Sequence, residues 1–395
     1  MKRRHLHFCR EGLYFVVIMA FIVGGAIMRQ INLLMLLFGL MAGPLLFNLF
    51  SVYLMLPRLQ LRRRLPDMVA AGDPLVVELT ATNIFARGAA WAVVVDDRVE
   101  RVGDHSYAAA ITSSVMFTHV PAGDSRKLSY RGVLTRRGRY RFGPLGLSTR
   151  FPLGLVRCYM PYGENSGDQE LLVLPRVGEL THRWTKMREE AYQRTRSPHQ
   201  RRGMLEGDFH NLRPWRTGDS RRWIHWRTTA RQGELMVRQF EQQLQRDLAL
   251  IVELWQPAQP NAHQTDSVEL AVSFAASICT EMCRRGGCQL VFGLSATQQQ
   301  FYSGPASLAL QEDALTTLAL AEATPKDHLP QVMIGCLDLI PQGTQIVLVS
   351  TRPVDLNDQQ RFATFWQDSR GRSLAGRVLP IDASSGELQH YFQPT

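Results

Sequence analysis

Seven arginines in one short segment are the residues whose type and spacing point most directly to chemistry. The segment runs from residue 205 to residue 242, and three tryptophans lie among the arginines. Arginine keeps its charge at physiological pH, and its guanidinium group stacks on aromatic faces. Such a segment is either a recognition surface for an acidic partner or an internal clamp of hydrogen-bonded ion pairs. The arginines are Arg213, Arg216, Arg221, Arg222, Arg227, Arg231 and Arg238, and the tryptophans are Trp215, Trp223 and Trp226.

The segment's own residues predict the local structure that positions these side chains. Gly218 favours a turn, Asp219 is a good helix N-cap, and residues 220–231 are compatible with a helix that ends before Gly233. Helical spacing gives this helix one aromatic and apolar face, formed by Trp223, Trp226 and Ala230.

We favour the clamp for most of this segment and a partner-facing role for two arginines. Arg213 and Arg222 are predicted to form structural pairs, while Arg216 and Arg221 are predicted to face an acidic partner. The residues assigned to the clamp are Asp208, Arg213, Trp215, Gly218, Asp219, Arg222, Trp226, Ala230 and Arg231.

Catalysis is not indicated by the segment or by the rest of the chain. His210 and His225 flank the arginines, but the nearby hydroxyl residues lack a nucleophile elbow or a triad setting. The sequence carries no phosphate-binding loop, dinucleotide glycine motif or zinc-protease motif. We therefore expect a protein that is not an enzyme and that has no cofactor.

Composition narrows the class of protein and of partner. The 395 residues are 45% hydrophobic and 20% charged, which is typical of two or three folded domains. A net charge of +10 favours acidic partners, but without a recognised nucleic-acid module we expect no nucleic acid among them. The cysteines lack a paired framework, which indicates reduced thiols, and Cys279, Cys283 and Cys288 are expected to be core thiols rather than zinc ligands.

Two apolar stretches near the N-terminus predict a membrane anchor. Residues 12–28 are apolar throughout and residues 31–56 nearly so, and a membrane span needs roughly 17–25 apolar residues. The chain must turn near Arg29, because a single helix of this length would far exceed the hydrocarbon core. A signal peptide is the alternative, but the second stretch would still stop translocation.

Basic residues on both flanks predict the orientation of this hairpin. Arginines or lysines precede the first stretch at positions 2, 3, 4 and 10 and follow the second at positions 58 and 62–64. The positive-inside rule then places both termini and the soluble domains in the cytosol, with a two-pass anchor in the membrane.

The remaining chain changes character twice. Residues 59–176 contain short β-rich runs between turn residues, which favours an antiparallel β-sandwich. After residue 246, apolar strands at 248–254, 288–294, 345–350 and 377–381 alternate with helices near 266–284, 307–321 and 355–369, which indicates a parallel sheet covered on both faces. The predicted domains are therefore an anchor at 1–58, a β-sandwich at 59–180 and an α/β domain at 181–395.

The arginine segment resembles the bacterial domain of unknown function fifty-eight (DUF58) family. The matching residues are Leu212-Arg213-Pro214-Trp215, Gly218-Asp219, Arg222-Trp223-Ile224-His225-Trp226 and Ala230-Arg231, with further matches upstream at 137–144, 152–155 and 172–176. Three positions depart from the family pattern: Trp215 stands where Tyr is usual, His225 where Asp is usual, and Phe151 where Asp is usual. The resemblance covers the chain from about residue 59 to the end.

This resemblance implies a von Willebrand factor A-like α/β domain and a MoxR-type AAA+ ATPase as partner. A metal-binding domain of that kind carries Asp-x-Ser-x-Ser after its first strand, whereas this chain has Glu253-Leu254-Trp255-Gln256-Pro257. One carboxylate remains and both hydroxyls are lost, so we expect no metal at the degenerate position Glu253. The prediction is a non-enzymatic, membrane-anchored adaptor or assembly factor; the alternative is a metal-dependent ligand-binding module or an enzyme with its site at the strand ends.

Overall fold

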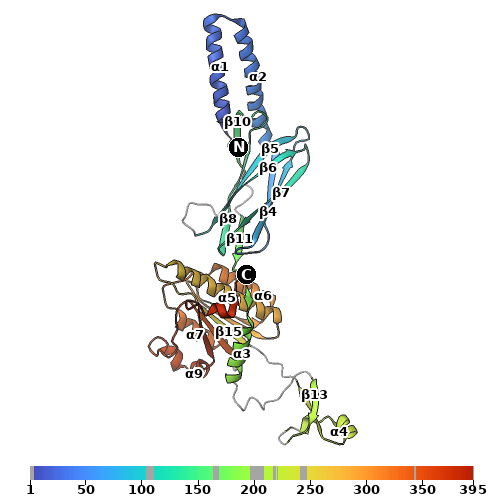
Figure 1. The fold of residues 1–395 in the computed structure, drawn as a ribbon, viewed down its shortest axis with the longest axis vertical. Helices are drawn as coiled ribbons and strands as arrows, with labels where there is room; N and C mark the ends of the chain where they lie inside the picture. The colour runs from blue at the N-terminus through green and yellow to red at the C-terminus, as the bar shows by residue number, and fades with distance from the viewer. Residues whose placement is uncertain are drawn as a thin grey trace. The chain divides into compact units, whose positions relative to one another are not determined.

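The computed structural model describes residues 4–103, 111–162, 169–195, 209–216, 219, 221–240, 247–341 and 344–394. Within these residues the chain divides into two compact units, Met1–Arg176 and Val177–Thr395 (Figure 1). The predicted apolar stretches and the predicted β-rich region lie together in the first unit. The predicted α/β region lies in the second unit.

Two long apolar helices begin the first unit. Strand β1 (His5–Phe8) is followed by α1 (Arg10–Arg29) and α2 (Asn32–Met55), and the turn between the helices occupies Gln30 and Ile31 as predicted. Both helices are long and apolar enough to cross a membrane. The short 3-10 helix η1 (Leu56–Arg58) leads directly into strand β2.

Two β-sheets form the rest of the first unit. The smaller sheet has the order β2 (Leu59–Arg64), β4 (Pro74–Asn83) and β7 (Ser125–Val133). The larger has the order β1, β10 (Val156–Tyr162), β9 (Leu145–Thr149), β5 (Ala90–Arg101), β8 (Gly138–Phe142), β11 (Gln169–Leu174) and β3 (Val69–Ala70), with β6 (Ile111–Val120) paired to β5. Every pairing is antiparallel except that of β3 with β11, which departs from the predicted all-antiparallel arrangement.

Alternating side chains of the two sheets share one hydrophobic core. Leu59 and Leu61 of β2 and Val93, Val95 and Val99 of β5 are all buried in it. The same alternation turns Arg63 and Asp97 inward, where the Arg63 Nη1 lies 2.7 Å from the Asp97 Oδ1. The Tyr130 hydroxyl donates to the other Asp97 oxygen at 2.8 Å. Burial raises the pKa of the Asp97 carboxyl, and the Arg63 charge and Tyr130 hydrogen bond oppose that rise.

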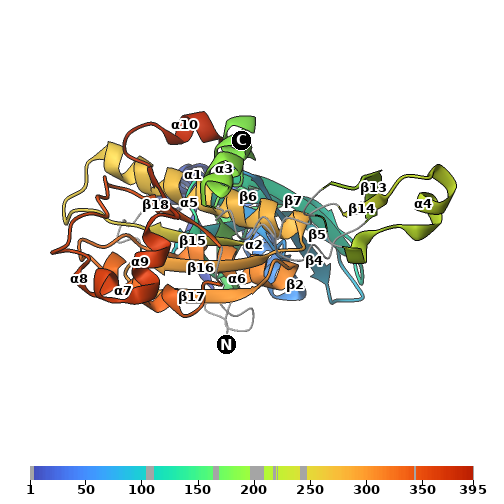
Figure 2. The same cartoon turned by 90° about the horizontal axis from the view of Figure 1, so that it is seen from below.

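The second unit is built on a five-stranded sheet. Its order is β17 (Gln300–Pro305), β16 (Gln289–Ser295), β15 (Leu248–Glu253), β18 (Gln345–Ser350) and β19 (Val378–Asp382), which run side by side (Figure 2). Strands β16, β15, β18 and β19 are mutually parallel, whereas β17 pairs antiparallel with β16. The expected purely parallel sheet is therefore wrong at this edge, because a short hairpin connects β16 to β17.

Helices surround this sheet, and its central strands are fully buried. Helix α5 (Ala262–Arg285) begins at Asn261, whose side chain and that of Gln264 form a reciprocal capping box. It packs against α6 (Leu308–Leu320). Helices α7 (Leu329–Leu337), α8 (Ala363–Gln367) and α9 (Ser369–Ala375) share a second core with the sheet. The helix predicted at 355–369 lies further along the chain as α8 and α9, and α7 was not predicted.

The remaining elements of the second unit are short. Strand β12 (Glu179–Leu180) pairs with β20 (Phe392–Gln393), next to α10 (Leu388–Tyr391), and α3 (His182–Thr195) follows β12. The arginine segment folds as β13 (Phe209–Pro214), η3 (Arg221–Trp223), α4 (Trp226–Gln232) and β14 (Met236–Phe240), with β13 and β14 antiparallel.

Candidate functional site

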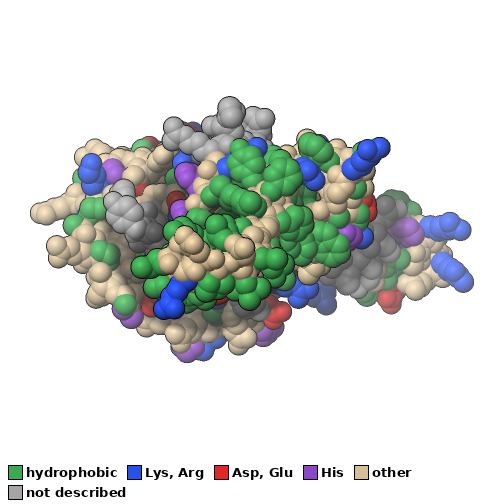
Figure 3. Space-filling model, turned by 90° about the horizontal axis from the view of Figure 1, so that it is seen from above, with side chains coloured by type: hydrophobic (Ala, Val, Ile, Leu, Met, Phe, Trp, Pro, Cys, Tyr) green, Lys and Arg blue, Asp and Glu red, His purple; other side chains and the backbone are tan. Residues whose placement is uncertain are grey.

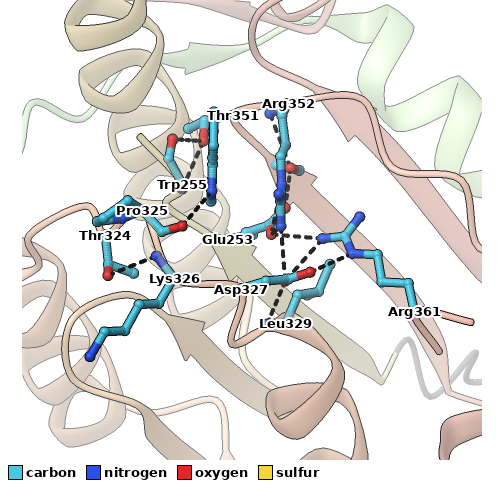
Figure 4. Close-up of polar contacts among 11 residues, drawn as sticks. Glu253, Trp255, Thr324, Pro325, Lys326, Asp327, Leu329, Thr351, Arg352 and Arg361 are labelled. Carbon is cyan, nitrogen blue, oxygen red and sulfur yellow. Dashed lines mark hydrogen bonds and ion pairs between the residues drawn. The ribbon is translucent and has the colours of Figure 1, made fainter. Parts of the chain in front are cut away.

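The carboxyl ends of β15 and β18 bring together four charged residues and one serine, which we call the strand-end cluster. It consists of Glu253, Asp327, Ser350, Arg352 and Arg361 (Figure 4). Glu253 is the last residue of β15 and Ser350 the last of β18, while the other three come from loops. In parallel sheets this edge is where ligands bind, because the strand ends and their loops converge there.

Glu253 is the centre of the strand-end cluster, and its side chain is only 2% exposed. Its Oε1 accepts from Arg352 Nη2 at 2.6 Å, from Arg352 Nε at 3.1 Å and from Arg361 Nη2 at 3.1 Å. The Ser350 hydroxyl donates to the other carboxylate oxygen. Both oxygens of this buried carboxylate are therefore occupied by protein donors.

Asp327 is a second carboxylate that binds the same two arginines. Arg361 Nε donates to its Oδ2 at 2.7 Å, and Arg352 Nη2 lies 2.8 Å from its Oδ1. Burial raises the pKa of Asp327, but the Arg361 hydrogen bonds and the two guanidinium charges outweigh burial and hold that pKa below its usual value. The two carboxylates and two guanidinium groups thus form a closed, charge-balanced network.

Aromatic faces fix the two guanidinium groups further. The Arg352 guanidinium lies 4.9 Å from the Trp255 ring centroid, and that of Arg361 lies 5.0 Å from the Phe362 ring centroid. The Trp255 backbone is held in turn by the Thr351 hydroxyl, and its indole N–H donates to the Pro325 carbonyl. Trp255 lies in the loop compared above with a metal-binding loop, and its ring packs against an arginine.

The arginine segment forms a second candidate site. Arg213 and Asp219 make a bidentate pair with distances of 2.8 and 2.7 Å, and the Asp219 carboxylate also accepts the Arg216 backbone N–H at 2.8 Å. This pairing with Arg213 lowers the pKa of Asp219 and raises that of Arg213. The Arg213 side chain is 33% exposed and that of Asp219 14% exposed, so the pair lies at the surface of the β13–β14 hairpin.

The predicted capping role of Asp219 is wrong, because the α-helix begins later than expected. Helix α4 starts at Trp226, and its N-cap is His225, whose ring nitrogen accepts the Thr228 backbone N–H. The predicted helix over 220–231 is interrupted at Ile224, which bridges to β14. His225 thus takes the capping role for which Asp is a common choice.

The other assigned residues of this segment have the following positions. Arg216, Arg221, Arg222, Ala230 and Arg231 are exposed, Trp215 and Trp223 are partly buried, and Trp226 is 66% exposed. The predicted apolar face of the helix is therefore not a buried face. Asp208 and Gly218 lie outside the described residues.

Sequence reasoning singled out Glu253 but missed Asp327, Arg352 and Arg361. Arg352 follows the predicted strand 345–350 by two residues, so the convergence of strand ends was a usable signal for it. Arg361 was assigned to the interior of a predicted helix, and no local pattern marks it or Asp327.

The cysteines are all free thiols, and burial raises the pKa of Cys279, Cys283 and Cys288.

Comparison with solved structures gave weak likenesses in fold. The CARDB domain of a Pyrococcus furiosus protein, solved in complex with di-metal ions, is 14% identical, with 29% of this chain and 87% of that chain covered and a TM-score of 0.20. The β-glucosidase of Listeria innocua is 16% identical over 29% of this chain and 16% of its own length, with a TM-score of 0.20. Scores of this size do not establish a shared fold.

Comparison with curated proteins gave no match. A family model described as protein of unknown function DUF58 matches residues 211–337, from the arginine segment to the end of α7. That match covers about a third of the chain and supports its relation to the DUF58 family.

Proposed function

We propose that this chain is a membrane-anchored, non-enzymatic adaptor that works with a MoxR-type AAA+ ATPase. In this proposal α1 and α2 cross the bacterial inner membrane, and both termini and both soluble domains lie in the cytosol. The two sheets of the first unit form a β-sandwich, and the second unit is a von Willebrand factor A-like domain. The observation that carries the proposal is that two arginines, Arg352 and Arg361, bind the buried Glu253 carboxylate.

The contacts of Glu253 at the strand ends argue against a metal site and favour a protein-binding role for the second unit. A divalent cation needs several oxygen ligands with free lone pairs. The lone pairs of Glu253 face Arg352, Arg361 and Ser350, and two guanidinium charges would repel a cation at this point. The residues therefore do not fit a metal ion, although the site has the position that a metal would take in such a domain.

The same contacts support a non-enzymatic role. A general base needs a carboxylate or imidazole that is open to substrate, and Glu253 is buried under its arginines. The pKa of Asp327 is held below its usual value by Arg361 and Arg352, so this carboxylate is a poor proton acceptor at neutral pH. Within the described residues no group of three His, Cys, Asp or Glu side chains could hold a metal ion.

Exposed arginines of the β13–β14 hairpin form the proposed partner surface. Arg216 and Arg221 are exposed, and Asp219 binds both the Arg213 side chain and the Arg216 backbone N–H. Charges at such a rim mainly raise the association rate and the salt dependence of binding. An acidic face on the ATPase fits them, in keeping with the net charge of +10.

The experiment is affinity purification of the full chain from detergent-solubilised membranes, followed by identification of co-purifying ATPases. We expect an AAA+ ATPase with the wild-type chain and a salt-sensitive loss of it with Arg216→Glu plus Arg221→Glu. Arg131→Glu, an exposed arginine of β7, is the matched control and should retain the ATPase. If no ATPase is recovered with the wild-type chain, the adaptor proposal fails; equal recovery with all variants removes the arginines from the partner surface.

A further inference from the structure

The membrane-type hairpin and the β-sheets of the first unit share one core. Val52, Met55 and Leu56, at the end of α2, are buried in the same hydrophobic cluster as the strands. Asn48 is fully buried, and its Oδ1 accepts the Val156 backbone N–H at 3.1 Å. The hairpin is therefore not tethered through a linker but continues directly into the folded β unit.

The start of α1 is locked to the same strand region. The Cys9 backbone N–H donates to the Leu155 carbonyl at 3.0 Å. Gly12 lies against that carbonyl so closely that a Cβ at Gly12 would be 2.0 Å from the Leu155 oxygen. Strand β1 also pairs with β10 along His5–Phe8. The hairpin is thus joined to the β unit at both of its ends.

These contacts involve only the base of the hairpin. Beyond Gly12 in α1 and before Asn48 in α2, residues 13–29 and 32–47 remain outside the contacts that hold the base of the hairpin. At 1.5 Å per residue they correspond to roughly 25 Å and 24 Å. A hydrocarbon core is about 30 Å thick, and Phe50 and Tyr53 of α2 remain exposed beyond Asn48, so the edge of the membrane would fall close to the base of the hairpin, where the β unit begins.

Apolar side chains of the β unit are exposed at this position, and we call them the hairpin-end rim: Ile84, Phe85, Trp91 and Leu153. The Ile84 backbone N–H donates to the Arg58 carbonyl just after α2, and the Phe85 ring lies 5.1 Å from the Arg58 guanidinium. The Trp91 backbone N–H contacts the Met55 sulfur at 3.3 Å. Leu153 lies in the turn that leads to Leu155. The rim therefore surrounds the base of the hairpin.

Charges around the hairpin-end rim suit the surface of an anionic bilayer. Arg10, Arg87 and Arg150 are exposed there, against the exposed carboxylates of Glu11 and Asp124. Figure 3 looks down on the tip of α1 and α2, where hydrophobic side chains gather. Tryptophan next to basic side chains is typical of the membrane–water interface, where the ring meets the hydrocarbon edge and the cations meet phosphates.

We propose that the hairpin-end rim inserts into the head-group layer of an anionic bilayer, so that the β unit is itself part of the membrane attachment. The proposal rests on the anchoring of α1 and α2 in the membrane. It adds a second, interfacial contact at the base of the hairpin. Lipid is the occupant that fits, because the rim continues the surface of two helices that already have membrane composition.

The test uses the full chain in nanodiscs of phosphatidylcholine with phosphatidylglycerol. A photo-crosslinking phenylalanine analogue is placed at Phe85 or at Leu153, and at Met68 or Val133 as controls. All four positions are exposed and apolar, but Met68 and Val133 lie at the opposite end of the same sheets. We expect lipid adducts at Phe85 and Leu153 to exceed those at the controls severalfold, and to decrease when phosphatidylglycerol is omitted.

Hydrogen exchange provides the second readout. The amides of residues 84–91 should exchange more slowly in nanodiscs than in detergent, and Phe85→Glu plus Leu153→Glu should remove that protection while nanodisc incorporation persists. Incorporation without lipid adducts at Phe85 and Leu153 would overturn the rim and leave the hairpin anchor standing. Adducts to a second copy of the chain would also overturn it. Failure to incorporate at all would reject the anchor and the rim together.

Discussion

Replacing Arg361 should lower the free energy of unfolding of the second unit. The size of the loss can be worked out from the contacts of the strand-end cluster. Arg361→Gln deletes one hydrogen bond to Glu253 and two to Asp327. Hydrogen bonds to charged groups contribute ~1.5–3 kcal/mol, and breaking a fully buried ion pair costs ~3–5 kcal/mol. Arg361 is 18% exposed, and Arg352 still binds both carboxylates after the change. We therefore expect a loss of about 1.5–3 kcal/mol.

The second arginine makes the prediction sharper. In the double variant Arg352→Gln plus Arg361→Gln, Glu253 keeps only the Ser350 hydroxyl and remains a buried charge with no cation beside it. Its loss of stability should exceed the sum of the two single losses, because either arginine alone still neutralises Glu253. Adding Glu253→Gln to Arg361→Gln should recover part of the loss, since the stranded charge is then removed.

Hydrogen exchange of β15 and β18 amides in the full chain is the assay, because a chain of several units need not unfold in a single two-state transition. Arg131→Gln is the control, and as an exposed substitution it should change stability by no more than about 0.5 kcal/mol. If Arg361→Gln falls within that range, or if its effect is independent of Glu253, the cluster does not stabilise the strand ends as argued.

The same variant has a predicted pH dependence. The pKa of Asp327 is lower in the folded chain than its usual value of about 3.9, so its ion pairs stabilise the fold above that pH. The contribution is lost as the pH falls through the folded pKa. Arg361→Gln moves that pKa back toward the usual value, so the stability difference between wild type and variant should shrink below about pH 4.

Three further predictions concern other parts of the chain. Magnesium, manganese or calcium should leave the melting temperature unchanged, and a saturable rise that vanishes in Glu253→Ala would restore a metal role to the strand ends. Reporter fusions after Arg64 and at the C-terminus should both indicate the cytoplasm, and an exported signal at either point would reverse the topology. Asp97→Ala should destabilise the first unit by roughly 3–5 kcal/mol in hydrogen exchange, because it strands Arg63 in the core; an effect below about 1 kcal/mol would mean that the pair is not buried as a unit.

Local patterns predicted the elements that repeat simple periodicities. The run of apolar residues at 345–350 is β18 as predicted, and the two apolar stretches near the N-terminus are α1 and α2. Strand β5 spans Ala90–Arg101, although Asp96, Asp97 and Arg98 interrupt its apolar pattern. Its alternation continues through these charges, and Asp97 points inward because Arg63 neutralises it there.

The strand-end cluster could not be assembled from local patterns, because its members are distant in sequence. Glu253 and Arg361 are 108 residues apart, and they meet only because β15 and β18 are neighbours in the sheet. The hairpin of β13 and β14 illustrates the opposite limit. Its pieces are local, but Asp219 had two acceptable roles, and its pairing with Arg213 was preferred over helix capping.

Asn48 and Glu253 follow the same physical rule with different consequences. A buried side-chain oxygen is stabilised by a hydrogen-bond donor from the fold, because water cannot reach it. In the sequence Asn48 is only a polar interruption of an apolar helix, yet its bond to Val156 marks where α2 joins the β core. Glu253 is a buried carboxylate at a strand end, and its two arginines supply the positive charge from within the chain. In both cases the partner, rather than the residue type, decides what the position does.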